Sequence, residues 1–159
     1  MATGKTETAR LLAKNLKRPF VEMDDLIVSR EGMPITEIFA SKGEAYFREL
    51  EKKLVREISQ QKDVVVACGG GTFVDPENIE VLKRTGTVIC LTSTPEVILK
   101  RASRFGYRPL LNVADPRKAI QELLAKRQPF YAQAHHVIDA DQLTVEQTAA
   151  EILKRLDLT

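Results

Sequence analysis

The sequence lacks the features of a membrane or secreted protein. No apolar run approaches the roughly 18 residues that a membrane-spanning helix needs. The N-terminus has no apolar stretch of the kind that forms the core of a signal peptide. From these two absences we expect a cytoplasmic protein with no membrane partner.

Cysteine is scarce, and neither sign of charge dominates. Cys68 and Cys90 both lie in apolar runs typical of strands, which favours reduced thiols in a core over a disulfide framework or a metal site. The 24 Lys and Arg residues against 22 Asp and Glu residues leave a net charge of +2, which does not indicate a nucleic-acid partner.

The order of apolar patterns predicts an α/β protein. The 159 residues contain no repeat and no low-complexity linker, so we expect one domain, residues 1–159, with its own core. Strands that alternate with helices predict a parallel sheet with helices on both faces. The predicted strands span residues 20–23, 63–68, 87–91 and 136–139. The predicted helices span residues 6–15, 24–30, 34–39, 43–61, 75–84, 94–103 and 116–134, with a last helix capped by Thr144.

A phosphate-binding motif stands at the start of the chain. Gly4, Lys5 and Thr6 match the second half of the G-x-x-x-x-G-K-[ST] loop, and an apolar helical pattern follows at once. In such a loop the glycine allows close backbone approach, the lysine reaches the β- and γ-phosphates of ATP, and the threonine hydroxyl binds Mg²⁺. The alternative is a common tripeptide in a flexible N-terminus.

Polar residues follow two of the predicted strands, where ligands bind in parallel sheets. Glu22 and Asp24 can hold Mg²⁺ through water or serve as the base for a substrate hydroxyl, whereas the alternative is helix capping by Asp24 or Asp25. Gly69, Gly70 and Gly71 come directly after a buried strand. They indicate either close approach of an anionic or hydroxylated ligand to the backbone or a tight structural turn.

Three arginines are candidates for binding carboxylate or phosphate groups, because guanidinium groups bind such anions bidentately. Arg48 lies on a predicted helix, Arg108 in the irregular segment 104–115, which can act as a lid, and Arg127 just before Pro129, which can kink its helix. Taken singly, each is better explained as a surface residue, and for Arg48 the alternative is a solvated helix face with Glu44 and Lys52 as partners. We interpret His135 and His136 as structural, since neighbours on a strand point to opposite faces.

Together these pieces resemble the shikimate kinases, small P-loop kinases of the nucleoside-monophosphate-kinase type. The matching segments run in order through nearly the whole chain: Met1-Ala-Thr-Gly-Lys-Thr, Phe20-Val-Glu-Met-Asp-Asp-Leu-Ile, Ile35-Thr-Glu-Ile-Phe-Ala, Gly43-Glu-Ala-Tyr-Phe-Arg-Glu-Leu-Glu, Gly69-Gly-Gly, Arg108-Pro-Leu-Leu and Lys126-Arg-Gln-Pro-Phe-Tyr. The resemblance implies a three-layer α/β fold whose first strand is central, substrate-binding helices over about residues 24–61, a lid over about residues 104–115, and a monomer.

The resemblance also implies residue roles. Gly4, Lys5 and Thr6 would bind ATP, with Thr6 and Glu22 serving Mg²⁺. Asp24 would hold the ring hydroxyls of shikimate and act as the base. The carboxylate of shikimate would bind Arg48 and Arg127, supported by the backbone of Gly69, Gly70 and Gly71. Arg108 would be the lid arginine on the phosphates, and Arg101 would face the adenine.

The chain departs from the family pattern at its beginning. Glu22 stands where the family usually has aspartate, and Ala2 stands where glycine is common. The first glycine of the loop and the central strand would fall before Met1. We expect the chain to begin about ten residues further upstream, which is roughly one strand and the first glycine.

The implied reaction is ATP-dependent phosphorylation of the 3-hydroxyl of shikimate in aromatic amino-acid biosynthesis. One alternative is a kinase for another small hydroxy acid such as gluconate. A second alternative is a truncated relative that binds shikimate without catalysis.

Overall fold

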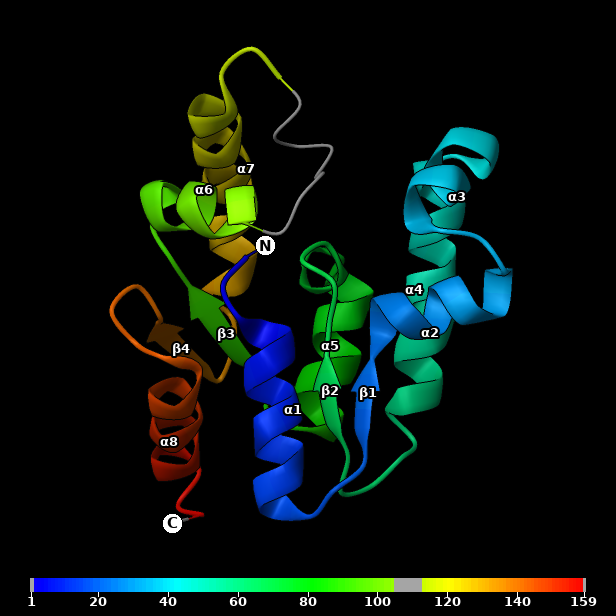
Figure 1. Cartoon of the computed structure of the whole chain (residues 1–159). Helices are drawn as coiled ribbons and strands as arrows, with labels where there is room; N and C mark the ends of the chain where they lie inside the picture. The colour runs from blue at the N-terminus through cyan, green and yellow to red at the C-terminus, as the bar shows by residue number, and fades with distance from the viewer. Residues whose placement is uncertain (1, 105–112, 159) are drawn as a thin grey trace. The chain divides into compact units, whose positions relative to one another are not determined.

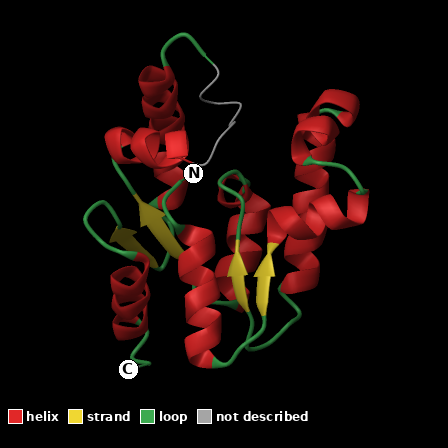
Figure 2. Cartoon of the chain, viewed as in Figure 1, coloured by secondary structure: helices red, strands yellow, loops and turns green. Residues whose placement is uncertain are grey.

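The structure is a computed structural model of the chain and describes residues 2–104 and 113–158. Helices dominate, and each strand is short (Figure 2). The elements labelled in Figure 1 are α1 (Lys5–Leu16), β1 (Phe20–Glu22), α2 (Met23–Glu31), α3 (Ile35–Lys42), α4 (Glu44–Ile58), β2 (Val65–Ala67), α5 (Pro76–Thr85), β3 (Ile89–Thr92), α6 (Pro95–Arg104), α7 (Pro116–Tyr131), β4 (His136–Asp139) and α8 (Val145–Arg155), with a 3-10 helix η1 (Thr72–Val74) between β2 and α5.

The chain divides into two compact units, which are described separately. One unit comprises Met1–Thr8 and Val88–Thr159, and the other comprises Ala9–Thr87. Each contains one parallel strand pair, β3 with β4 in the first and β1 with β2 in the second. Parallel pairing confirms the prediction, but the described strands form two pairs and not one continuous sheet. The expectation that the first strand of the fold lies at the centre of the sheet stays a prediction.

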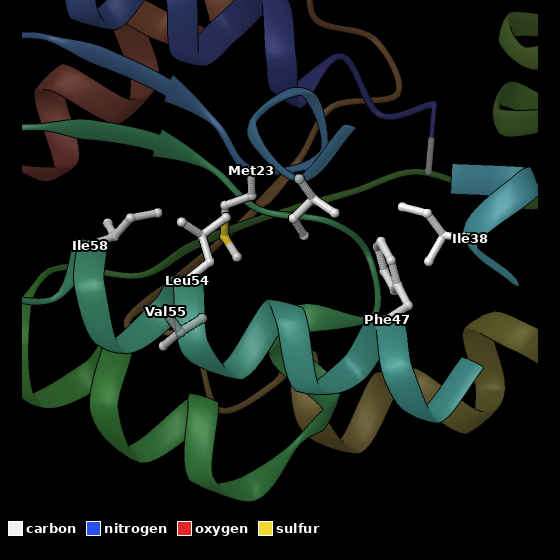
Figure 3. Close-up of a cluster of buried hydrophobic side chains, with 7 residues drawn as sticks. Met23, Ile38, Phe47, Leu54, Val55 and Ile58 are labelled. Atoms are coloured by element: carbon white, nitrogen blue, oxygen red, sulfur yellow. The ribbon is translucent and has the colours of Figure 1, made fainter. Parts of the chain in front are cut away.

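The core of the unit Ala9–Thr87 lies between α4 and the segments α2 and α3. Figure 3 shows Leu54 of α4 pointing toward Met23 and Phe47 of α4 pointing toward Ile38. The buried residues of α4 recur at helical spacing, as the sequence predicts. At about 1.5–3 kcal/mol for each large apolar side chain removed from water, this stripe is what holds α4 in place. Its members are Phe47, Leu54, Val55 and Ile58.

The unit that contains Val88–Thr159 has its own apolar core. Its buried apolar side chains come from α6, α7, β4, α8 and the residue after β4, and they are Ile98, Ala102, Ile120, Ile138, Ala140, Ala149 and Ile152. His135 ties the start of the strand pair together, because its Nδ1 atom accepts a hydrogen bond from the Val88 N–H at 3.0 Å. This contact supports the structural interpretation of His135.

Helix ends follow the expected signals in some places and not in others. Gly32 ends α2 with a left-handed φ of 68°, and the Thr144 side chain caps α8 within a capping box with Gln147. The predicted capping of α2 by Asp24 or Asp25 is wrong. Glu22 is the N-cap residue, and both aspartates lie in the first turn, where acidic groups favour the helix dipole.

Boundaries differ from the predicted ones by a few residues. Helix α4 ends at Ile58 and not at residue 61, and α7 ends at Tyr131 and not at residue 134. The sequence did not predict η1, because a three-residue helix is too short to show a period. Within the described ranges, no helix is long and apolar enough to cross a membrane.

Candidate functional site

The predicted phosphate loop leads directly into α1. Gly4 has a φ of 81°, and Lys5 and Thr6 are the first two residues of the helix. A Cβ atom added to Gly4 would meet nothing within 4 Å, so this side of the loop is open. A helix N-terminus next to open space suits a phosphate group, because its first N–H groups and its dipole both attract anions. The loop therefore fits the nucleotide that the sequence predicts.

Ala2 is in a conformation that favours glycine. Its φ is 44°, in the left-handed region where a Cβ atom is strained. This strain explains why glycine suits the corresponding position of such a loop.

Arg48 is held between two carboxylates on its own helix, α4. Its Nη1 atom donates to Glu51 Oε2 at 2.5 Å, while its Nε and Nη2 atoms donate to Glu44 Oε1 at 3.4 and 3.2 Å. Burial alone would lower the pKa of Arg48, but the hydrogen bonds and attraction of Glu51 and Glu44 outweigh it and raise that pKa. The guanidinium is thus a fixed positive charge in a half-buried place.

Sequence reasoning included Glu51 in a matching segment but gave it no role, and it is the most deeply buried carboxylate of this unit. Glu51 is 1% exposed, and its Oε1 atom accepts a hydrogen bond from the Thr72 hydroxyl at 2.7 Å. A signal was available, since Glu51 lies four residues after Phe47 and four before Val55 on the buried stripe of α4. A charged residue on an apolar stripe needs a partner inside the protein.

The glycine run makes room for side chains of the site itself. A Cβ atom on Gly71 would come within 2.3 Å of Arg48 Nη1, so the guanidinium lies against the glycine backbone. A Cβ atom on Gly69 would lie 3.0 Å from Asp24 Oδ1 and 3.1 Å from Glu51 Oε1. Protein side chains are thus the closest neighbours of both glycines, and the predicted approach of a ligand to this backbone stays a prediction. Gly70 lies between them and is half-buried.

Two acidic residues, Glu22 and Asp24, stand where β1 leads into α2. Glu22 is the last residue of β1 and is half-buried, and Asp24 lies in the first turn of α2. Near Gly69, oxygen atoms of Asp24, Glu51 and Thr72 come together. The Asp24 carboxylate and the Arg48 guanidinium can bind a ligand that carries both hydroxyl groups and a negative charge, whereas the buried Glu51 and Thr72 bond to protein groups.

The other predicted arginines belong to the unit with Val88–Thr159. Arg101 on α6 donates to Ser93 Oγ at 3.3 Å and to the Ala140 carbonyl at 2.8 Å. Arg127 on α7 donates to the Tyr131 hydroxyl at 3.5 Å and is half-buried. Arg108 lies outside the described residues.

Over residues 2–104 and 113–158, no three His, Cys, Asp or Glu side chains gather as a metal site. This finding leaves the predicted Mg²⁺ ligands Thr6 and Glu22 untested. Mg²⁺ usually keeps several waters and binds through one or two protein groups together with phosphates.

Three comparisons with known proteins agree. A family model described as shikimate kinase matches residues 1–157. The chain is 44% identical to the shikimate kinase of Caldanaerobacter subterraneus subsp. tengcongensis, over 97% of this chain and 90% of the relative. The solved shikimate kinase of Acinetobacter baumannii in complex with shikimate has a TM-score of 0.92 at 36% identity, covering 98% of this chain and 88% of that one. A gluconokinase from Sinorhizobium meliloti, with a TM-score of 0.64 at 15% identity, shares the fold alone.

Proposed function

The chain belongs to the shikimate kinase family, and on this premise we propose that it transfers the γ-phosphoryl group of ATP to the 3-hydroxyl of shikimate. The family is one of α/β P-loop-type kinases that use ATP with Mg²⁺ in aromatic amino-acid biosynthesis. The observation that carries the proposal for this chain is Arg48. Its half-buried guanidinium lies beside Gly71 and donates to Glu51, and Asp24 Oδ1 lies beside Gly69, two residues earlier, which suits a small hydroxylated carboxylate.

On the acceptor side, Arg48 binds the carboxylate of shikimate, with Arg127 as a second arginine. Asp24 binds the ring hydroxyls and accepts the proton of the 3-hydroxyl. The backbone of Gly69, Gly70 and Gly71 supports the substrate. As the 3-oxygen forms its bond to the γ-phosphorus, the bond from that phosphorus to the β–γ bridging oxygen breaks and ADP leaves.

On the donor side, Gly4 and the N–H groups that begin α1 bind the phosphates, with Lys5 at the β- and γ-phosphates. Thr6, and Glu22 through water, hold Mg²⁺. When bound, Mg²⁺ neutralises charge on the transferring phosphoryl group. Arg108 closes on the phosphates and Arg101 faces the adenine.

We further propose the finer features that the family suggests. The chain acts as one domain, residues 1–159, and as a cytoplasmic monomer in which a three-layer parallel sheet has helices on both faces. Residues 24–61 carry the substrate-binding helices, and residues 104–115 form the lid. No nucleic acid or membrane partner is needed for this reaction.

A coupled assay of ADP release tests the function. The purified protein with Mg²⁺ and ATP is expected to turn over shikimate, with a kcat/KM at least about a hundredfold above that for gluconate, because a site built for one set of hydroxyl groups rejects another. Lys5→Ala is expected to abolish turnover while calorimetric binding of shikimate persists. A folded protein that binds Mg·ATP and does not turn over shikimate would refute the proposal.

A further inference from the structure

A buried chain of hydrogen bonds connects the 3-10 helix η1 to Arg48. The Thr72 hydroxyl donates to Glu51 Oε1 at 2.7 Å, and Glu51 Oε2 accepts from Arg48 Nη1 at 2.5 Å. Thr72 and Glu51 are 0% and 1% exposed. Water therefore does not compete for these groups, and each hydrogen bond has its full effect on geometry.

Thr72 is itself fixed by its backbone. Its N–H donates to the Gly69 carbonyl at 3.1 Å, and its own carbonyl accepts from the buried Asn78 side-chain amide at 3.1 Å. A β-branched side chain has few rotamers, so a fixed backbone also fixes the hydroxyl. Thr72 is thus a rigid donor, while Glu51 is a long side chain with three rotatable bonds that needs such a donor.

Fixing Glu51 determines which edge of Arg48 is available. With Nη1 held by Glu51 and the guanidinium lying against Gly71, the Nε and Nη2 edge faces Glu44. Glu44 is 65% exposed in its side chain, so this edge is the one that reaches toward solvent. The Nε and Nη2 pair is also an edge that binds a carboxylate with two parallel hydrogen bonds.

We propose that Thr72 is a positioning residue for substrate binding: through Glu51 it orients Arg48 so that the Nε and Nη2 edge is presented to the substrate carboxylate. The inference rests on the proposed function, in which Arg48 binds that carboxylate. It adds a residue that never touches the substrate and yet sets the affinity for it.

The test compares Thr72→Val with Thr72→Ser. Valine keeps the shape and removes the hydroxyl, which leaves Glu51 Oε1 without its donor. Thr72→Val is expected to raise the KM for shikimate about tenfold, the usual effect of losing a hydrogen bond to a charged group. The KM for ATP should change less than about twofold, because the change leaves the nucleotide residues untouched. Thr72→Ser keeps the donor and should restore the KM for shikimate to near the wild-type value.

Thr148→Val is the matched control. Thr148 is 2% exposed, and its hydroxyl donates to the backbone carbonyl of Thr144. Thr148→Val therefore also removes a buried, hydrogen-bonded hydroxyl, but at a residue that is not connected with Arg48. It should lower the melting temperature without changing the KM for shikimate. If Thr72→Val does not accumulate as a folded protein, Thr72→Ala takes its place. Alanine also removes the hydroxyl, and because its side chain is smaller it cannot overpack the site, so the same rise in the KM for shikimate is expected.

A double-mutant cycle with Arg48→Lys separates positioning from general damage. If Thr72 acts through the arginine, Thr72→Val should change shikimate affinity by less than about twofold once Arg48 is lysine. A Thr72→Val protein that melts earlier but keeps the wild-type KM for shikimate, or a Thr72→Ser protein as impaired as Thr72→Val, would overturn the inference. Absence of wild-type turnover with shikimate would instead mean that the proposed function has failed.

Discussion

At the scale of single residues, Gly71 and Arg48 depend on each other. The closest neighbour of a Cβ atom at position 71 is the far end of the Arg48 side chain, at 2.3 Å. Because that end can move while the backbone stays, Gly71→Ala should fold and displace the guanidinium. The KM for shikimate should rise at least about tenfold, since a charged hydrogen bond contributes roughly 1.5–3 kcal/mol.

Gly86→Ala is the control for this change. Its added Cβ atom would lie 3.9 Å from the nearest atom, the Leu82 carbonyl oxygen, and the φ of −162° suits alanine. Steady-state kinetics of both variants should show a raised KM for Gly71→Ala alone. Equal KM values in the two variants would contradict the account of Arg48 against Gly71.

If Arg48 binds the substrate carboxylate as proposed, Glu44 competes with the substrate for one edge of the guanidinium. It is largely exposed and pairs with Arg48 at i,i+4 spacing, an arrangement worth only about 0.3–0.5 kcal/mol. Glu44→Gln should therefore lower the KM for shikimate about twofold at low salt, with a smaller effect at high salt.

The control for this prediction is Glu80→Gln, which removes a similar exposed i,i+4 pair, with Arg84 on α5. This variant should leave the KM for shikimate unchanged. A rise in KM for Glu44→Gln would show instead that Glu44 helps to orient the arginine for its substrate.

At the scale of elements, the start of α5 is held to α4 by Asp75. Its side chain accepts hydrogen bonds from the N–H groups of Glu77 and Asn78, and it pairs with Lys52 of α4 at 3.1 Å. Burial alone would raise the pKa of Asp75, but the hydrogen bonds from Lys52, Asn78 and Glu77 outweigh it and lower that pKa. The carboxylate thus stabilises the folded state mainly in its charged form.

The sign of the pH dependence follows from the lowered pKa. The stabilisation is complete above the unfolded-state pKa of about 4 and is lost as the pH falls through the lower folded-state value. Asp75→Ala should cost about 1 kcal/mol of unfolding free energy at pH 7. Urea unfolding should show this difference shrinking below about pH 4.

Thr144→Ala in α8 provides the comparison. Thr144 also caps a helix through its side chain, but its hydroxyl does not titrate in this range. Thr144→Ala should lower the free energy of unfolding by a similar amount, and this loss should stay constant with pH. A difference for Asp75→Ala that persists unchanged at pH 3 would mean that the charge of Asp75 contributes nothing.

At the scale of the whole molecule, ligand binding should raise the stability of the protein by mass action. Shikimate at a hundred times its Kd should add about 2.7 kcal/mol to the free energy of unfolding. For a chain of this length that corresponds to a rise in melting temperature of roughly 5–10 °C. Arg48→Lys should lose most of the shift with shikimate and keep the shift with Mg·ATP, and Lys5→Ala should do the reverse. Differential scanning fluorimetry distinguishes the two patterns, and equal losses in both variants would contradict the separate roles of Arg48 and Lys5.

The sequence by itself determined the order and type of most elements, and the family. The signals that predicted these elements each involve residues close together in the sequence, so they do not depend on the tertiary structure. They are the apolar periodicity, the glycine at the end of α2 and the threonine at the start of α8. The motif at Gly4, Lys5 and Thr6 likewise needs only neighbouring residues and a helix start. The family resemblance, drawn from such segments in order, is confirmed by the match over residues 1–157.

The sequence places Glu44 and Glu51 near Arg48 on one helix, but the tertiary structure alone brought Thr72 to Glu51 and Gly71 to Arg48. Glu51 and Thr72 are 21 residues apart, and nothing in their local patterns indicates that they meet. Whether the glycine run admits a ligand or a side chain also depends on how α4 packs beside β2 and η1, which brings the guanidinium against Gly71. The arginine and its partners on α4 are therefore local in the sequence, while its contact with Gly71 and the link through Glu51 to Thr72 depend on long-range packing.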